Sequence, residues 1–140
     1  MTTFNKFNCF VADICNKVHN LGADVLQVAL CATANAPVAT NTVLANLTQV
    51  AYTNLSTQVI TIISSTQTSG TYKLVLVDLV LTASGGAVAS FQYIVIFNQT
   101  SVTPTDALIG WYNYGSALTL ADGDTFTIDF DGANGVIQIV

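Results

Sequence analysis

The amino-terminal segment has the apolar spacing of an amphipathic helix. Its large apolar residues recur at steps of three and four, which places them on one face at 3.6 residues per turn. Thr2 or Thr3 can cap the start of such a helix, and Gly22 can end it. The pattern predicts a helix over about residues 4–21, with an apolar stripe formed by Phe4, Phe7, Val11, Ile14, Val18 and Leu21.

After Gly22 the pattern changes to short strand-like runs separated by turn residues. Pairs such as Gly85-Gly86 and Asn134-Gly135 supply the positive φ angles of tight hairpin turns. Many short runs of this kind are typical of antiparallel sandwiches and barrels. We predict a long loop over 36–53 with one helical turn near 43–47, and strands at 25–32, 58–64, 71–82, 91–98, 107–114, 117–120, 125–130 and 136–140.

These elements predict a mainly β fold. A length of 140 residues indicates one domain over residues 1–140, long enough to bury a core without a disulfide or a metal ion. No internal repeat or linker divides the chain. We expect an antiparallel β-sandwich, jelly-roll-like, with the helix at about 4–21 packed against it.

Two of the predicted strands are apolar on both faces. Alternation along 74–81 places Leu74, Leu76 and Val80 on one side and further apolar residues on the other. Along 91–97, Ile94 and Ile96 are likewise opposed by large apolar residues. A sandwich strand with one solvated face normally alternates apolar with polar residues. The second face must therefore be covered, either by the predicted helix or by a partner subunit.

The segment 110–115 adds aromatic residues to the candidate contacts. Alternation sends Trp111 to one side of a strand and Tyr112 and Tyr114 to the other, so at least one side is expected in the core. The other side can contact a protein or a carbohydrate. The candidate interface predicted from the sequence comprises Phe4, Phe7, Leu74, Leu76, Ile94, Ile96, Trp111 and Tyr112.

The composition is poor in charge. Charged residues make up 8% of the chain, against about 25% in an ordinary soluble domain. With three Lys, no Arg and a formal net charge of −5, the chain lacks the basic cluster that phosphate neutralisation requires, which excludes a nucleic-acid partner. A surface of hydroxyl and amide groups loses little charge solvation on docking, which favours contacts with proteins.

The sequence shows no membrane or export signal. No apolar run reaches the roughly 20 residues of a membrane helix. The start of the chain lacks the basic region and continuous apolar stretch of a signal peptide, so we expect neither membrane insertion nor secretion. Cys9, Cys15 and Cys31 show no C-x-x-C pairing and are expected to be buried thiols.

The chain offers few groups for catalysis. His19 is the only His, so no metal site can draw two His ligands from one chain. It lies near the end of the predicted helix, where capping the last carbonyls or packing is its expected role. Cys9 and Cys15 are six residues apart, which on a helix is about 240° and does not bring them together. We predict a non-enzymatic protein with no catalytic residues, no cofactor and no metal site.

The acidic residues near the carboxyl end form two groups. The two groups lie at opposite ends of the predicted strand 125–130. Asp122 and Asp124 stand at its start, and Asp129 and Asp131 stand at its end. About five strand residues separate the groups by roughly 17 Å, too far for a shared calcium ion or a glycosidase carboxylate pair. Asp before Gly is also common in hairpin turns. Turn formation is therefore the predicted role of these carboxylates.

Several stretches, in matching order over most of the chain, carry a family resemblance. They are Phe4–Phe7, His19–Gly22, Pro37–Ala45, Leu81–Gly86, Phe91–Tyr93, Leu108–Gly115, and Leu120–Gly123 with Thr125–Phe126. Through them the chain resembles small virion structural proteins of tailed bacteriophages, which are similar to capsid decoration (cement) proteins in size and β-rich character. The chain departs from that family in carrying fewer charges, with Gln92 inside the Phe-x-Tyr motif.

This resemblance implies a virion protein, made in the host cytoplasm, that binds the outer capsid shell and stabilises the assembled head. Its expected partners are the major capsid protein or other virion proteins, and it is expected to form a homo-oligomer. Two alternatives stay open at this point. One is a tail, neck or fibre-base component, and the other is a carbohydrate-binding or adhesin-like module.

Overall fold

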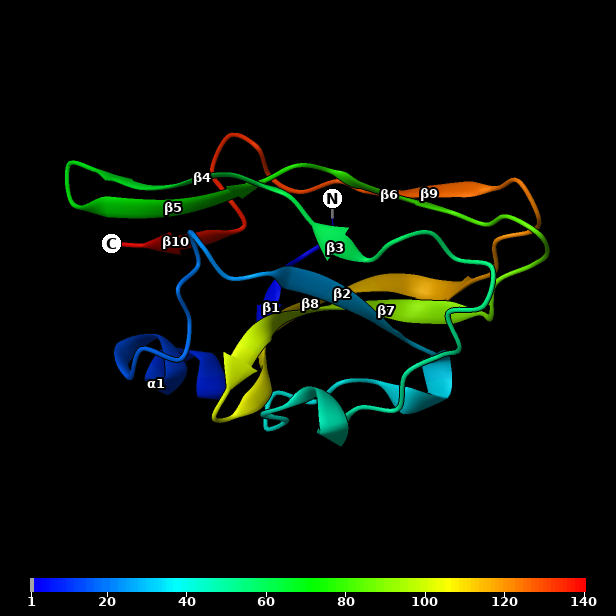
Figure 1. Ribbon diagram of the computed structural model, residues 1–140, viewed down its shortest axis with the longest axis horizontal. Helices are drawn as coiled ribbons and strands as arrows, with labels where there is room; N and C mark the ends of the chain where they lie inside the picture. The colour runs from blue at the N-terminus through cyan, green and yellow to red at the C-terminus, as the bar shows by residue number, and fades with distance from the viewer. Residues whose placement is uncertain (1) are drawn as a thin grey trace.

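The computed structural model describes residues 2–140 and arranges them as two β layers, with the helix and the 3₁₀ turns beneath the lower layer (Figure 1). Hydrogen-bonded strand pairs are antiparallel throughout the described chain. The elements are β1 (Asn5–Lys6), α1 (Cys9–Cys15), β2 (Leu26–Cys31), η1 (Thr33–Asn35), η2 (Leu44–Asn46), β3 (Val59–Ile60), β4 (Ile62–Thr68), β5 (Thr71–Leu76), β6 (Leu79–Thr82), β7 (Phe91–Val102), β8 (Thr105–Leu118), β9 (Thr125–Ile128) and β10 (Ile137–Ile139).

The lower layer is a five-stranded sheet in the order β1-β8-β7-β2-β3. Its centre is the long hairpin of β7 and β8, in which Ile94 pairs with Tyr112. On the other side of β7, Val28 of β2 pairs with Ile96. β7 is a central strand with large apolar side chains on both faces, so these side chains must be covered above and below the sheet.

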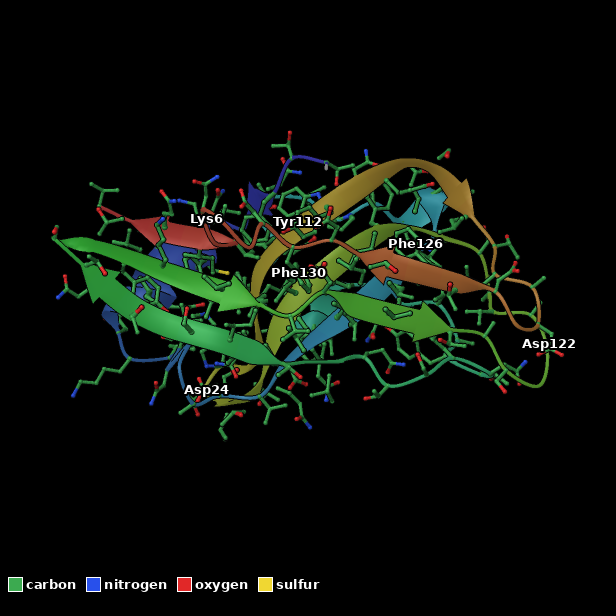
Figure 2. All side chains as sticks on the ribbon, turned by 90° about the horizontal axis from the view of Figure 1, so that it is seen from above. Lys6, Asp24, Tyr112, Asp122, Phe126 and Phe130 are labelled. Carbon is green, nitrogen blue, oxygen red and sulfur yellow. The ribbon has the colours of Figure 1, made fainter. Side chains whose placement is uncertain are left out.

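The upper layer consists of a three-stranded sheet, β10-β5-β4, and a two-stranded sheet, β6-β9. Seen from above, the two sheets lie end to end in one layer (Figure 2). The chain passes from β5 into β6 with only two residues between them, so this segment connects the two sheets within the upper layer. The prediction of a mainly β antiparallel sandwich with one helix is confirmed.

The main core lies between the two layers. It draws large apolar side chains from the upper layer, such as Leu74, Leu76 and Leu81, and others from the lower layer, such as Ile94 and Ile96. All five have exposed fractions of 3% or less. Burial of apolar side chains at this density is the principal stabilising contribution to the fold.

A second apolar cluster covers the lower face of the five-stranded sheet. Phe7 packs on Trp111 with ring centroids 4.5 Å apart, and Leu44 and Leu47 from the η2 region pack against the same cluster. The chain itself therefore covers both faces of β7. The buried members of this cluster are Phe7, Ala29, Cys31, Val95, Phe97 and Leu108.

The predicted helix over 4–21 is too long, because α1 spans Cys9–Cys15 alone. Before it, Asn5 pairs with Trp111 and the backbone N–H of Phe7 donates to the carbonyl of Ile109, which keeps this segment extended along the edge of β8. After it, Lys17 adopts a φ of 63°, outside the helical region. Sheet hydrogen bonds thus replace helical ones at the amino end.

The predicted strand 71–82 is two strands, β5 and β6, separated at Val77 and Asp78. The carboxylate of Asp78 accepts a hydrogen bond from the backbone N–H of Phe130 at 2.9 Å. The interruption shifts the alternation, so that Leu74 and Leu76 in β5 and Leu81 in β6 all face the core. The continuous alternation predicted from the sequence is therefore wrong at this point.

The other predicted elements agree more closely with the structure. The predicted loop over 36–53 contains the expected helical turn, η2, at Leu44–Asn46. The predicted strand 107–114 and the first two residues of the predicted strand 117–120 form one strand, β8, which runs on through Gly115 at a φ of 97°, a value that glycine adopts without strain.

Candidate functional site

Four of the predicted interface residues lie inside the core. Leu74, Leu76, Ile94 and Ile96 have exposed fractions of 1, 2, 3 and 1%. Leu74 and Leu76 come from the upper layer, and Ile94 and Ile96 come from the lower layer. All four belong to the core between the layers, so they contact other core residues and not a partner. The physical reason is that β5 and β7 lie in opposite layers and turn these side chains toward each other, so the chain itself covers the face that was assigned to a partner.

The aromatic members of the predicted interface lie around the amino-terminal segment. Phe7 is fully buried against half-buried Trp111 beneath the lower sheet. Phe4 is half-buried, with its ring centroid 5.3 Å from that of Tyr112, which is 5% exposed. β1 and β8 thus bring together four residues far apart in the sequence, but mainly as packing contacts.

Three apolar side chains of the upper layer are exposed, and of these only Val80 was placed by the sequence pattern on a face that needs cover. Ile63, Val77 and Val80 have exposed fractions of 61, 42 and 49%, and we call them the outer strip. The backbone N–H of Val77 donates to the carbonyl of Thr61, which holds this part of the chain beside β4. The sequence feature that marks the strand break is Asp78, a charged residue within an apolar run. If 71–76 and 79–82 are taken as separate strands, Val80 can face outward while Leu74 and Leu76 face the core.

His19 belongs to a buried polar cluster beside the sheet. The amide nitrogen of Asn98 lies 3.1 Å from Nδ1 of His19 and donates to the Asp24 carboxylate at 2.6 Å. Burial lowers the pKa of His19, against smaller opposing effects of Asp13 and Asp24. The predicted packing role of His19 holds, whereas its predicted contact with helix carbonyls is replaced by the contact with Asn98.

The three thiols have different surroundings. Cys31 is buried, Cys9 is half-buried and Cys15 is exposed, and all three are free. Burial raises the pKa of the Cys31 thiol to about 11. Burial, followed by the negative charge of Asp13, raises that of Cys9 to about 11. The prediction of buried thiols is therefore correct for Cys31 and wrong for Cys15.

The carboxylates near the carboxyl end mostly stabilise turns, as predicted. Asp122 accepts a hydrogen bond from the backbone N–H of Gly85 at 2.9 Å, and Asp124 accepts one from Ala121 at 2.9 Å. Hydrogen bonds from Asn134 lower the pKa of Asp131. Among residues 2–140, no three His, Cys, Asp or Glu side chains are grouped so that they can hold a metal ion.

The comparisons with known proteins assign no family to this fold. No family model matches the chain, and neither a curated protein nor a solved structure matches it. Within residues 2–140, no helix has the length and hydropathy needed to cross a bilayer. The functional assignment consequently depends on the exposed surfaces and on the sequence resemblance described above.

Proposed function

We propose that the chain is a non-enzymatic structural protein of a bacteriophage virion that binds the outer capsid shell as a decoration protein. Its partners in this proposal are the major capsid protein or other virion proteins. The observation that carries the proposal is the outer strip of Ile63, Val77 and Val80, whose apolar side chains stand exposed on a β layer. The resemblance to small virion structural proteins supports the same assignment.

The surroundings of the outer strip suit contact with another protein. By register, Thr127 lies opposite Val80, and Thr82 lies opposite Thr125 on the same face. The carboxylate of Asp78 already accepts a hydrogen bond from the backbone of Phe130. Covering Val80 and the threonines beside it removes exposed apolar surface from water at little cost in desolvated charge, provided that the exposed carboxylate of Asp78 stays at the edge of the contact.

Internal packing of the sheets also supports docking through the outer strip. The chain covers both faces of β7 by itself, with Phe7 and Leu44 on the lower side. A partner is thus not required to complete the core, and the contact surface exists before docking. A protein that binds only the assembled shell stabilises it by mass action, because binding shifts the assembly equilibrium toward the bound state.

The experiment adds the purified chain to virion heads assembled without it. Bound chain is measured by co-sedimentation, and a labelled chain is located on intact particles by electron microscopy. Val80→Asp places a charge in the outer strip, where its desolvation weakens binding by about tenfold or more. Val102→Asp is the matched control, because Val102 is 78% exposed at the far end of β7.

Binding to heads that is lost in Val80→Asp and kept in Val102→Asp supports the proposal, provided that circular dichroism shows both variants folded. Label on the tail or neck, no binding to heads, or equal binding by both variants overturns it. Heads that bind the chain should also resist thermal disruption at higher temperature than bare heads. Equal thermal stability of bound and bare heads contradicts the stabilising role.

A further inference from the structure

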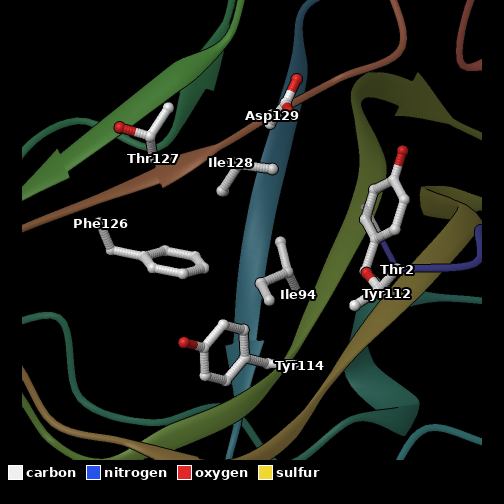
Figure 3. Close-up of a pocket in the computed structure, with 8 residues that line it drawn as sticks. All are labelled: Thr2, Ile94, Tyr112, Tyr114, Phe126, Thr127, Ile128 and Asp129. Carbon is white, nitrogen blue, oxygen red and sulfur yellow. The ribbon is translucent and has the colours of Figure 1, made fainter.

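A small pocket opens at the side of the sandwich where the two layers are not joined. It lies between β8, which continues past its short pairing with β1, and β9, which is paired with β6 alone. The pocket has a volume of about 230 Å³. Ile94 and Ile128, both core residues, form its apolar floor (Figure 3).

One end of the pocket is aromatic. The rings of Tyr114 and Phe126 meet edge to face, with centroids 5.5 Å apart and an interplanar angle of 88°. Phe126 is held in turn by Phe91, whose ring centroid lies 5.7 Å away. Tyr114 is 44% exposed, so its ring is accessible to a ligand in the pocket. These contacts orient an aromatic wall in advance of binding.

The opposite rim of the pocket is polar. The hydroxyl of Tyr112 and the carboxylate of Asp129 both point toward this rim (Figure 3). Burial, and then the negative charges of Asp131 and Asp129, raise the pKa of Tyr112, so its phenol stays protonated. The phenol can donate a hydrogen bond, whereas the carboxylate can only accept.

This arrangement selects the chemistry of the ligand. A neutral polyol carries several hydroxyl groups, each of which can accept a hydrogen bond from the Tyr112 phenol or donate one to the Asp129 carboxylate. The negative charge of Asp129 on the rim, with that of Asp131 near Tyr112, disfavours an anion, and none of the described lining residues is a Lys. The volume lies below the roughly 300–1,000 Å³ of sites for drug-sized molecules, which restricts the ligand to a single ring.

We infer that this pocket binds one hexose ring of a neutral glycan. The apolar face of the ring lies on Ile94, Ile128 and the aromatic wall, and its hydroxyls bond to Tyr112 and Asp129. This binding is an additional activity beyond capsid attachment, and its test uses the isolated chain. The result therefore stands or falls separately from the proposed function.

The experiment titrates the protein with the methyl glycosides of glucose, galactose, mannose and N-acetylglucosamine, followed by nuclear magnetic resonance. N-acetyl-tyrosinamide and N-acetyl-lysinamide represent protein side chains as competing ligands. We expect saturable binding of at least one glycoside, with shifts confined to residues around Ile94, Tyr114 and Phe126. No saturable binding of any glycoside, or preferred binding of an amino-acid amide, overturns the inference.

Variants assign the binding to the pocket. Asp129→Asn weakens the hydrogen bond from the ligand hydroxyl and is expected to lower affinity about tenfold. Asp106→Asn makes the same charge change at the start of β8, outside the pocket, and leaves affinity unchanged. Tyr114→Ala lowers affinity while Tyr114→Phe retains it. Equal affinities for Asp129→Asn and Asp106→Asn, or for Tyr114→Ala and Tyr114→Phe, overturn the inference.

Discussion

The amide nitrogen of Asn98 lies 3.1 Å from Nδ1 of His19, so the imidazole accepts this hydrogen bond and its neutral form carries the proton on Nε2. Both side chains are buried, and Asn98 is completely so. The carbonyl oxygen of Asn98 also accepts hydrogen bonds from the backbone N–H groups of Thr100 and Ser101. One side chain therefore ties the segment after α1 to β7.

Replacing this amide should destabilise the fold strongly. Asn98→Ala leaves the buried His19 and Ser101, and the backbone N–H of Thr100, without their partner, which we expect to lower the free energy of unfolding by about 3 kcal/mol. The adjacent Gln99→Ala is the control, because Gln99 is exposed, and its effect should stay within about 0.5 kcal/mol. Urea denaturation measures both, and equal losses would contradict the role assigned to Asn98.

The stability should fall as the solution is acidified through the titration range of His. Because burial lowers the pKa of folded His19, the unfolded chain takes up the proton first. The free energy of unfolding is therefore constant above about pH 7.5 and decreases as the pH falls through about 6.5. Asp13 and Asp24 oppose this shift with the smaller effects.

Denaturation at a series of pH values tests this dependence. His19→Gln should flatten the curve between about pH 7.5 and 5.5, above the range in which ordinary carboxylates titrate. A parent protein whose stability rises on acidification through that interval would show that His19 is charged in the folded state.

Gly110 should tolerate no side chain. A Cβ at this position would clash with Cζ of Phe4 and would lie 2.7 Å from the backbone oxygen of Asn5, which pairing with β8 holds in place. We expect Gly110→Ala to cost about 1–3 kcal/mol or more. Gly132→Ala meets no atom within 4 Å and should be neutral or slightly stabilising in the same thermal melts. Similar melting temperatures for the two variants would refute this packing.

Substitutions on the inner side of the upper layer should destabilise the fold, whereas substitutions on its outer side should leave the fold unchanged. Leu76→Ala removes a side chain that is 2% exposed and should cost about 2–5 kcal/mol. Leu76→Asp should prevent folding, whereas Val80→Asp should leave the circular dichroism spectrum unchanged, since Val80 is 49% exposed. Analytical ultracentrifugation then checks whether the folded Val80→Asp protein differs in assembly from the parent. A folded Leu76→Asp protein would place that residue outside the core.

The three thiols should react with an aromatic disulfide reagent at different rates. Near neutral pH, exposed Cys15 should react first. Cys31 and Cys9, each with a pKa raised to about 11, should react far more slowly, because the thiolate is the reactive form. In denaturant all three should react at one rate. Protection of Cys15 in the folded parent, or fast reaction of Cys31, would contradict the structure.

The predicted strands agree with the structure where local chemistry decides conformation. The runs around Leu26–Cys31 and Phe91–Val102 are rich in apolar residues, and turn residues such as Gly85 and Gly135, both with positive φ, separate such runs. Alternation and turn preference act over a few neighbouring residues, so they can be recognised from the sequence. The mainly β sandwich follows from these local signals.

Tertiary contacts decided which residues became the surface. The residues from Phe4 have helical spacing, but Asn5 and Lys6 form a strand instead. Asn5 pairs with Trp111 of β8, a residue far away in the sequence. Likewise, the predicted strand 71–82 is interrupted where Asp78 accepts a hydrogen bond from Phe130, and on either side of the interruption Leu76 lies inside and Val80 outside.

The candidate pocket and the buried polar cluster depend on the same kind of distant contact. Tyr112 of β8 and Asp129, which follows β9, line the same pocket although they belong to opposite layers. His19 and Asn98 are in contact although they are far apart in the sequence. The sequence by itself determined the β class, the turns and the low charge, because each is a local or compositional property. Only the tertiary structure decided which faces are covered and which side chains converge, because both depend on strand pairing between segments far apart in the chain.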